Sequence, residues 1–142
     1  MDRSNRRDKV ETFRVESVRI EARYENAFDY IANPENLPNW THAFKSVQKE
    51  KAIMATPAGT VEIELKVNSS PAQGTIDWRM KFPGGTEGIA YSRLVRQSNG
   101  QCIYSFVLLA PPVPLEQLEG ALNQQHAILK EELVKLSRLL SN

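Results

Sequence analysis

The chain has 142 residues, of which 41% are hydrophobic and 25% are charged, and its formal net charge is +1. This length predicts one domain that buries a core without metal or disulfide support, and the ordinary composition excludes a collagen-like or low-complexity chain. A single cysteine excludes an internal disulfide, and the sequence contains no apolar run of about 18 residues that would predict a membrane-spanning helix.

The first 11 residues are expected to form a flexible basic tail, and residues 12–142 the folded domain. Basic residues gather in this tail without aromatic residues between them, so we expect no nucleic-acid partner. The tail has no apolar leader segment, and we therefore expect a cytoplasmic location. The basic residues are Arg3, Arg6, Arg7 and Lys9.

A strand is predicted over residues 12–22, because apolar residues alternate with polar ones. The alternation changes phase between Val15 and Val18, which predicts a bulge or a bend near Glu16 and Ser17. A helix follows from the spacing of Ala27, Phe28, Ile31 and Ala32.

Proline punctuates the next segment. The pair Asn33-Pro34 is predicted to end the first helix, and Pro34 suits the first position of a second short helix. Pro38 is predicted to end that helix before Trp40.

The middle of the chain is typical of an antiparallel sheet with one wet face. Apolar and charged residues alternate strictly over residues 60–68 and again over residues 74–82. Further strands are predicted over residues 44–50, 52–56, 87–97 and 101–109. A long helix is then predicted from residue 114 to residue 140, because leucines recur there at three- and four-residue steps.

This order of elements, together with the opening segment VRIEARYENAFDYIANPENLPNW, resembles the START-like superfamily. That superfamily is the polyketide cyclase/dehydrase and lipid-transport group, also called SRPBCC, and includes the birch-pollen-allergen fold. The resemblance covers residues 12–140 and centres on the stretch from Asn33 to Trp40. It implies an α+β helix-grip fold, in which a curved antiparallel sheet of about seven strands wraps around the C-terminal helix. It also implies a hydrophobic cavity between the sheet and that helix, and it supplies no shared catalytic residues.

Residues expected to line this cavity lie on the apolar faces of the strands, on the long helix and around the second short helix. An inward hydroxyl from Tyr104 would orient a ligand, although a core hydroxyl bonded within the protein is the alternative. The candidate ligand-binding residues are Trp40, Phe44, Ile63, Leu65, Ile76, Trp78, Met80, Tyr104, Phe106, Leu122, His126 and Leu129.

The titratable candidates for catalysis are His42, Asp77 and His126. His126 lies on the apolar stripe of the long helix, so it either faces the cavity or bonds to a neighbour at the edge of the stripe. His42 and Asp77 would do acid–base work only if they met at the cavity mouth, and alternation turns Asp77 toward water. No sequence motif for a nucleotide, a metal or another cofactor is present, so no cofactor is expected.

These features predict a protein that binds or carries a small hydrophobic molecule, such as a lipid, quinone, polyketide or aromatic metabolite, as a monomer or homodimer. Two alternatives stay open. One is an enzyme of the cyclase or dehydratase kind that uses His or Asp as a general acid and base. The other is a protein-interaction module with a filled core, such as a chaperone co-factor or an obligate dimer.

Overall fold

The computed structural model of the chain describes residues 11–56, 58–110 and 115–141, with all their side chains except those of residues 115–119. The predicted basic tail lies outside these residues, apart from Glu11. Eleven elements follow one another: β1 (Phe13–Ile20), α2 (Tyr24–Ala32), the 3-10 helix η1 (Pro34–Asn36), α3 (Leu37–Trp40), β2 (Phe44–Gln48), β3 (Lys51–Thr56), β4 (Gly59–Ser70), β5 (Thr75–Lys81), β6 (Glu87–Arg96), β7 (Cys102–Leu109) and α4 (Leu115–Leu140).

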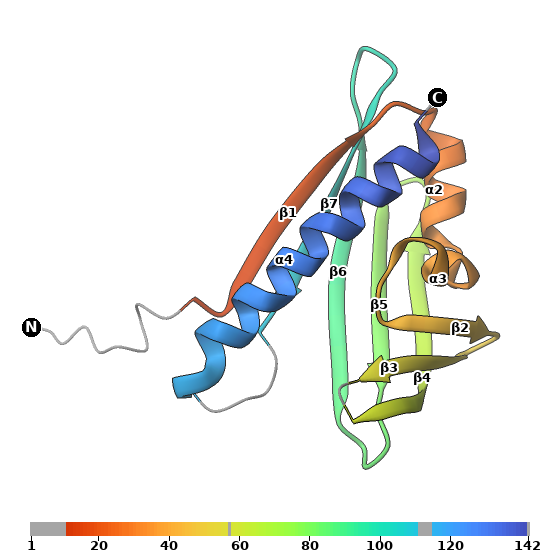
Figure 1. Cartoon of the computed structure of the whole chain (residues 1–142). Coiled ribbons are helices and arrows are strands. Elements are labelled where there is room, and N and C mark those ends of the chain that lie inside the picture. The colour runs from red at the N-terminus through yellow and green to blue at the C-terminus, as the bar shows by residue number, and fades with distance from the viewer. Residues whose placement is uncertain (1–10, 57, 111–114, 142) are drawn as a thin grey trace, which may run out of the picture.

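The seven strands form one antiparallel sheet in the order β1-β7-β6-β5-β4-β3-β2. The sheet curls so that β2 and β3 lie across the long strands, and α4 crosses the face that this curl partly encloses (Figure 1). α4 packs mainly along β1, and α2 and α3 lie near the C-terminal end of α4. The predicted helix-grip fold is confirmed.

Strict alternation decides which residues fill the core. Ile63 and Leu65 on β4 and Ile76 and Trp78 on β5 are buried, while Glu62, Glu64 and Lys66 are exposed on the opposite face. From α4, the buried residues of the main core cluster are Leu129, Leu133 and Leu136. Leu122 is also fully buried, but it lies outside that cluster.

The structure shows that the predicted bulge in β1 is wrong. Pairing with β7 runs without interruption from Phe13–Leu109 to Ile20–Cys102. Because the alternation is never reset, Phe13 and Val15 point away from α4, with exposed fractions of 51% and 50%.

The other face of β1 therefore carries polar residues toward α4, and they find polar partners there. The Arg14 guanidinium donates to Asn123 Oδ1 at 2.7 Å, and Glu16 Oε1 lies 2.8 Å from His126 Nε2. These contacts make the uninterrupted strand compatible with a helix packed along it.

Pro38 does not end the second short helix as predicted. It occupies the first turn of α3, where its missing N–H costs no hydrogen bond. The helix ends at Trp40, and the hydroxyl of the next residue, Thr41, donates to the Leu37 carbonyl oxygen at 2.7 Å. The end of α3 therefore places Trp40 and Thr41 beside the sheet.

Candidate functional site

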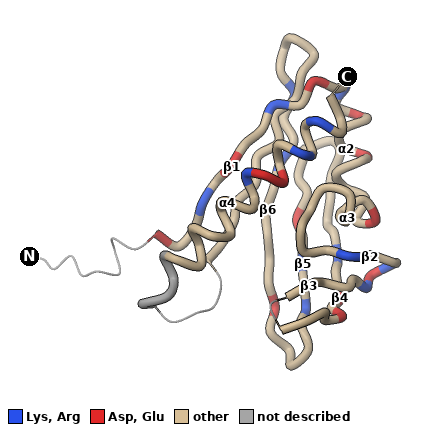
Figure 2. Tube along the Cα trace, viewed as in Figure 1, with Lys and Arg blue, Asp and Glu red and all other residues tan. Residues whose placement is uncertain are grey.

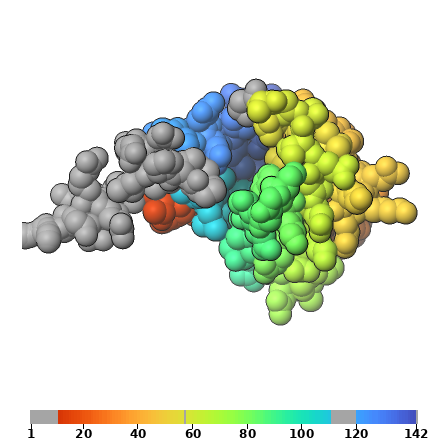
Figure 3. Space-filling view, turned by 90° about the horizontal axis from the view of Figure 1, so that it is seen from below, coloured from red at the N-terminus to blue at the C-terminus, as the bar shows by residue number. Residues whose placement is uncertain are grey.

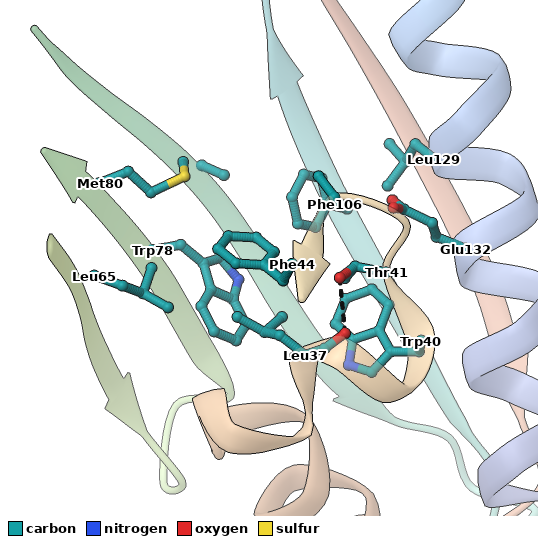
Figure 4. A pocket seen from close by; sticks show the side chains of 12 residues that line it. Leu37, Trp40, Thr41, Phe44, Leu65, Trp78, Met80, Phe106, Leu129 and Glu132 are labelled. Carbon is teal, nitrogen blue, oxygen red and sulfur yellow. Dashed lines mark hydrogen bonds between the residues drawn. The ribbon is translucent and has the colours of Figure 1, made fainter. Parts of the chain in front are cut away.

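A pocket of about 180 Å³ lies between the sheet, α3 and α4. Its wall comes from seven elements and the turn after α3, so residues far apart in sequence meet around it (Figure 4). The lining residues are Leu37, Trp40, Thr41, Ala43, Phe44, Leu65, Trp78, Met80, Ala90, Phe106, Leu129 and Glu132. Seen from below, the molecule is recessed between α4 and the yellow and green strands (Figure 3).

Large apolar side chains dominate the wall. Trp40 and Trp78 are almost fully buried, with exposed fractions of 2% and 4%. Phe44, Met80 and Phe106 are only partly buried and lie against the core cluster. A wall of this kind favours apolar ligand surface over water.

Glu132 is the only ionisable side chain that lines this pocket among the residues described. Its Oε2 accepts a hydrogen bond from the backbone N–H of His42 at 2.7 Å. Burial raises the pKa of the Glu132 carboxyl, against the opposing effect of that hydrogen bond. An acid placed in this way can receive a hydrogen bond, and when protonated it can donate one.

The two tryptophans also have polar atoms, which lie inside the protein beneath the pocket wall. Neither the Trp40 nor the Trp78 Nε1 has a hydrogen-bond partner among the described residues, although both atoms are buried. The Trp78 N–H lies close to the Tyr104 hydroxyl, but the two groups do not have the geometry of a hydrogen bond. Two buried donors are thus left without acceptors.

Seven of the twelve candidate ligand-binding residues line the pocket: Trp40, Phe44, Leu65, Trp78, Met80, Phe106 and Leu129. Ile63, Ile76 and Leu122 are buried elsewhere in the interior. The sequence reasoning missed Leu37, Thr41, Ala43, Ala90 and Glu132. Of these, Glu132 carried a readable signal, because it is three residues after Leu129 and four before Leu136, on the apolar stripe of α4.

Tyr104 is a core residue outside the pocket lining. Its hydroxyl donates to Ser92 Oγ at 2.8 Å, and the Ser92 hydroxyl donates to the Ile76 carbonyl oxygen at 2.6 Å. Burial raises the pKa of the Tyr104 phenol, which therefore stays protonated. The Tyr104 hydroxyl is therefore bonded within the protein, which was the alternative to contact with a ligand.

None of the three titratable candidates lines the pocket. His126 bonds to Glu16 on β1, and the His42 ring is half exposed with Nε2 3.7 Å from Glu131 Oε1. Asp77 lies on the outer face of β5, between the buried Ile76 and Trp78. The structure therefore gives His42 and Asp77 no shared site, and His42 reaches the pocket only through its backbone bond to Glu132.

Charge is spread over the described part of the chain (Figure 2). Blue and red segments alternate along α4 and β1, and no group of three or more potential metal-binding side chains occurs within the described ranges. Among the helices described, none is long and apolar enough to cross a membrane.

Comparison with solved structures identifies the class of fold. The protein XoxI from Bacillus cereus superposes with a TM-score of 0.67 at 14% identity, covering 92% of this chain and 96% of its own. A START superfamily protein from Mycobacterium smegmatis gives a TM-score of 0.62 at 11% identity, covering 92% of this chain and all of its own (100%). The Zhui aromatase/cyclase from Streptomyces sp. R1128 gives 0.62 at 8% identity, with coverages of 90% and 92%.

The chain has a START-like helix-grip fold. No protein-family model matches its sequence, and no curated protein matches it. At these identities the likeness concerns the fold alone, since one fold can carry many activities.

Proposed function

We propose that this chain binds a small, mostly apolar molecule in the pocket between the sheet and α4. The observation that carries the proposal is the pocket wall itself, which is apolar except for Glu132 and Thr41. Each Å² of apolar ligand surface buried there contributes about 25 cal/mol to binding. The aromatase/cyclase and START neighbours support the proposal, because their fold is the same.

The size of the pocket supports a compact ligand. A volume of about 180 Å³ slightly exceeds the roughly 150 Å³ of an engineered cavity that takes up benzene. A single-ring aromatic molecule or a short acyl chain therefore suits it better than a long lipid. Larger molecules would require Phe44 or Met80, which are partly buried at its edge, to move.

The test replaces a small residue of the pocket wall by a larger one, whose side chain occupies the space of the ligand. Ala90 lines the pocket on β6, and the next residue, Tyr91, points to the opposite face. We expect wild-type protein to give a saturable thermal shift with ethylbenzene or 4-ethylphenol, and Ala90→Leu to lose it. Tyr91→Leu is the matched control and should bind like wild type.

Native mass spectrometry of freshly purified protein provides an independent readout, because a co-purified ligand adds its own mass. If no probe shifts wild-type protein and Ala90→Leu melts well below wild type without ligand, the binding proposal is wrong, because the larger side chain then finds no free space. That result would favour a filled core and an interaction module.

An acid–base enzyme is the second candidate, and one observation favours it. Glu132 has a raised pKa in an apolar pocket, which is the environment of many general acids. Recovered ligand that is chemically changed by wild-type protein, and unchanged by Glu132→Gln, would promote this candidate over simple binding.

A further inference from the structure

One acidic group in the pocket wall has no counter-charge in the described part of the chain. Glu132 extends from α4 toward the pocket, and its carboxyl group lies on the side of Phe106 and Thr41 (Figure 4). Among the residues described, no Lys, Arg or His side chain pairs with it or lines the pocket. Carboxylates among apolar residues are normally paired with a cation, because an uncompensated charge is costly to bury. The described residues therefore supply the acid of an ion pair without its base.

One oxygen of this carboxyl group is available to a ligand. Oε2 accepts the His42 backbone N–H at 2.7 Å. Oε1 has no hydrogen bond within the described ranges, and unlike the two indole nitrogens it is not one of the buried atoms without a partner. Oε1 therefore has accessible surface, and a group bound in the pocket can reach it.

The other polar side chain of the wall also presents an acceptor. The Thr41 hydroxyl donates its proton to the Leu37 carbonyl oxygen at 2.7 Å, so its oxygen can only accept from a ligand (Figure 4). An ionised Glu132 likewise accepts and does not donate. The polar side chains of the wall thus suit a ligand group that donates hydrogen bonds and carries positive charge.

The surroundings of Glu132 act on its charge in both directions. Burial is the largest cause of its raised pKa, and the carboxylate of Glu131, the preceding residue on α4, acts in the same direction. The backbone N–H and the ring charge of His42 lower that pKa. The strands contribute no ionisable side chain to the wall among the residues described. A cation bound beside Glu132 would favour its ionised form and so oppose the effect of burial.

We infer that the ligand is a compact apolar molecule with a protonated amine at one end, which donates a hydrogen bond to Glu132 Oε1 while the hydrocarbon part contacts the apolar wall. The inference rests on the proposed function, because it assigns the ligand class of the same pocket. A pocket of about 180 Å³ suits one ring with a short side chain. An arylethylamine has this form.

Four probes of similar size test the charge. 2-Phenylethylamine carries the cation, 2-phenylethanol replaces it with a neutral donor, propylbenzene has no polar group, and phenylacetate is an anion. At pH 8 the amine is protonated, because alkylammonium groups have a pKa of about 10. We expect it to bind wild-type protein at least about tenfold more tightly than 2-phenylethanol, which is the size of one hydrogen bond to a charged group. Phenylacetate should bind most weakly, and isothermal titration measures all four affinities.

Two matched variants assign the charge to a residue. Glu132→Gln removes the charge and keeps an oxygen for the His42 N–H, so the advantage of the amine over the alcohol should disappear. Glu131→Gln makes the same change at a side chain that is 71% exposed, and the advantage should stay within about twofold of wild type. Saturable binding of propylbenzene by each variant shows that the pocket is intact.

A pH series gives a second readout. Because the pKa of Glu132 lies above the ordinary value of 4.5, more than half of this group is protonated at pH 4.5 in the free protein. Affinity for the amine should therefore fall more than about twofold between pH 8 and pH 4.5, relative to the alcohol. Glu132→Gln should show a smaller loss, and it controls for the charging of His42 over the same range.

The outcomes separate this inference from the proposal beneath it. If neither propylbenzene nor any other probe binds wild-type protein, the binding function itself fails. If propylbenzene binds and the amine has no advantage over the alcohol, the pocket is a simple apolar site and the inference is wrong. An amine advantage that persists in Glu132→Gln, or tighter binding of phenylacetate than of the amine, would also overturn it.

Discussion

Individual residues of the interior differ in whether their polar atoms are satisfied by the protein. Tyr104 and Ser92 form a closed chain of hydrogen bonds that ends on the Ile76 carbonyl oxygen. Trp78, on β5 next to the strand of Ser92, has a buried N–H with no such partner among the described residues. The first group stabilises the core, and the second is a buried donor left unpaired inside the protein.

Tyr104→Phe tests the structural role of this hydroxyl. The substitution removes one buried hydrogen bond and keeps the ring, so we expect a loss of about 0.5–1.5 kcal/mol in the free energy of unfolding. Urea denaturation measures it. Affinity for 4-ethylphenol should stay within about twofold of wild type, and a larger loss would place the hydroxyl in the binding site.

Glu132 predicts a pH dependence of stability whose sign follows from its raised pKa. The folded state holds the proton more tightly than the unfolded state, so stability from this group is fully present below the ordinary glutamate pKa. It is lost as pH rises through the folded pKa. Glu132→Gln cannot titrate and removes this loss.

We therefore expect the free energy of unfolding of Glu132→Gln to increase relative to that of wild type as the pH is raised from 4 to 7. Urea denaturation of both proteins at the two pH values measures the difference. Glu131→Gln, which alters the exposed neighbour, is the matched control. A difference that stays constant with pH would contradict the raised pKa.

Among the elements, β1 tests whether the alternation of its two faces continues along the whole strand. Val15 and Ile20 lie on opposite faces of the same strand, with exposed fractions of 50% and 0%. Val15→Thr should change the free energy of unfolding by less than about 0.5 kcal/mol. Ile20→Thr should cost about 2–4 kcal/mol, because it removes buried hydrocarbon and buries a hydroxyl.

Chemical denaturation of the two threonine variants checks this pair. Equal and large losses would mean that Val15 is also buried, as a bulge between the two positions would require.

Most elements could be predicted from the sequence because their patterns are one-sided. The alternation that buries Ile63, Leu65 and Trp78 was readable, and so was the leucine stripe of α4. The phase of β1 was not, because Arg14 and Glu16 face inward only by virtue of Asn123 and His126 on a distant helix. Sequence spacing contains no information on such a pairing.

The site was predictable in part for the same reason. An apolar face marks Trp78, Met80 and Leu129 as interior residues, but periodicity does not separate a pocket wall from a packed core. That distinction depends on how α3 packs against the sheet and α4. The same packing explains why His42 contributes its backbone N–H to the site and not its ring.

For the whole molecule, α4 is the cover of the sheet. Deleting residues 114–142 removes Leu129, Leu133 and Leu136 from the core cluster and leaves their apolar partners in water. We expect insoluble protein, measured as the soluble fraction after expression. A truncated chain that is soluble and unfolds cooperatively would mean that the sheet is stable without α4.

The strand order has a consequence for synthesis of the chain. β1 pairs only with β7, so Ile20 meets its partner Cys102 about 80 residues later. At 5–20 residues per second, a ribosome takes on the order of 4 to 16 seconds to make the intervening segment. Throughout this interval the nascent β1 has no strand to pair with, and Ile20, which is fully buried in the folded protein, stays open to chaperones. The last strand and helix to leave the ribosome are therefore the ones that hold the first strand in place.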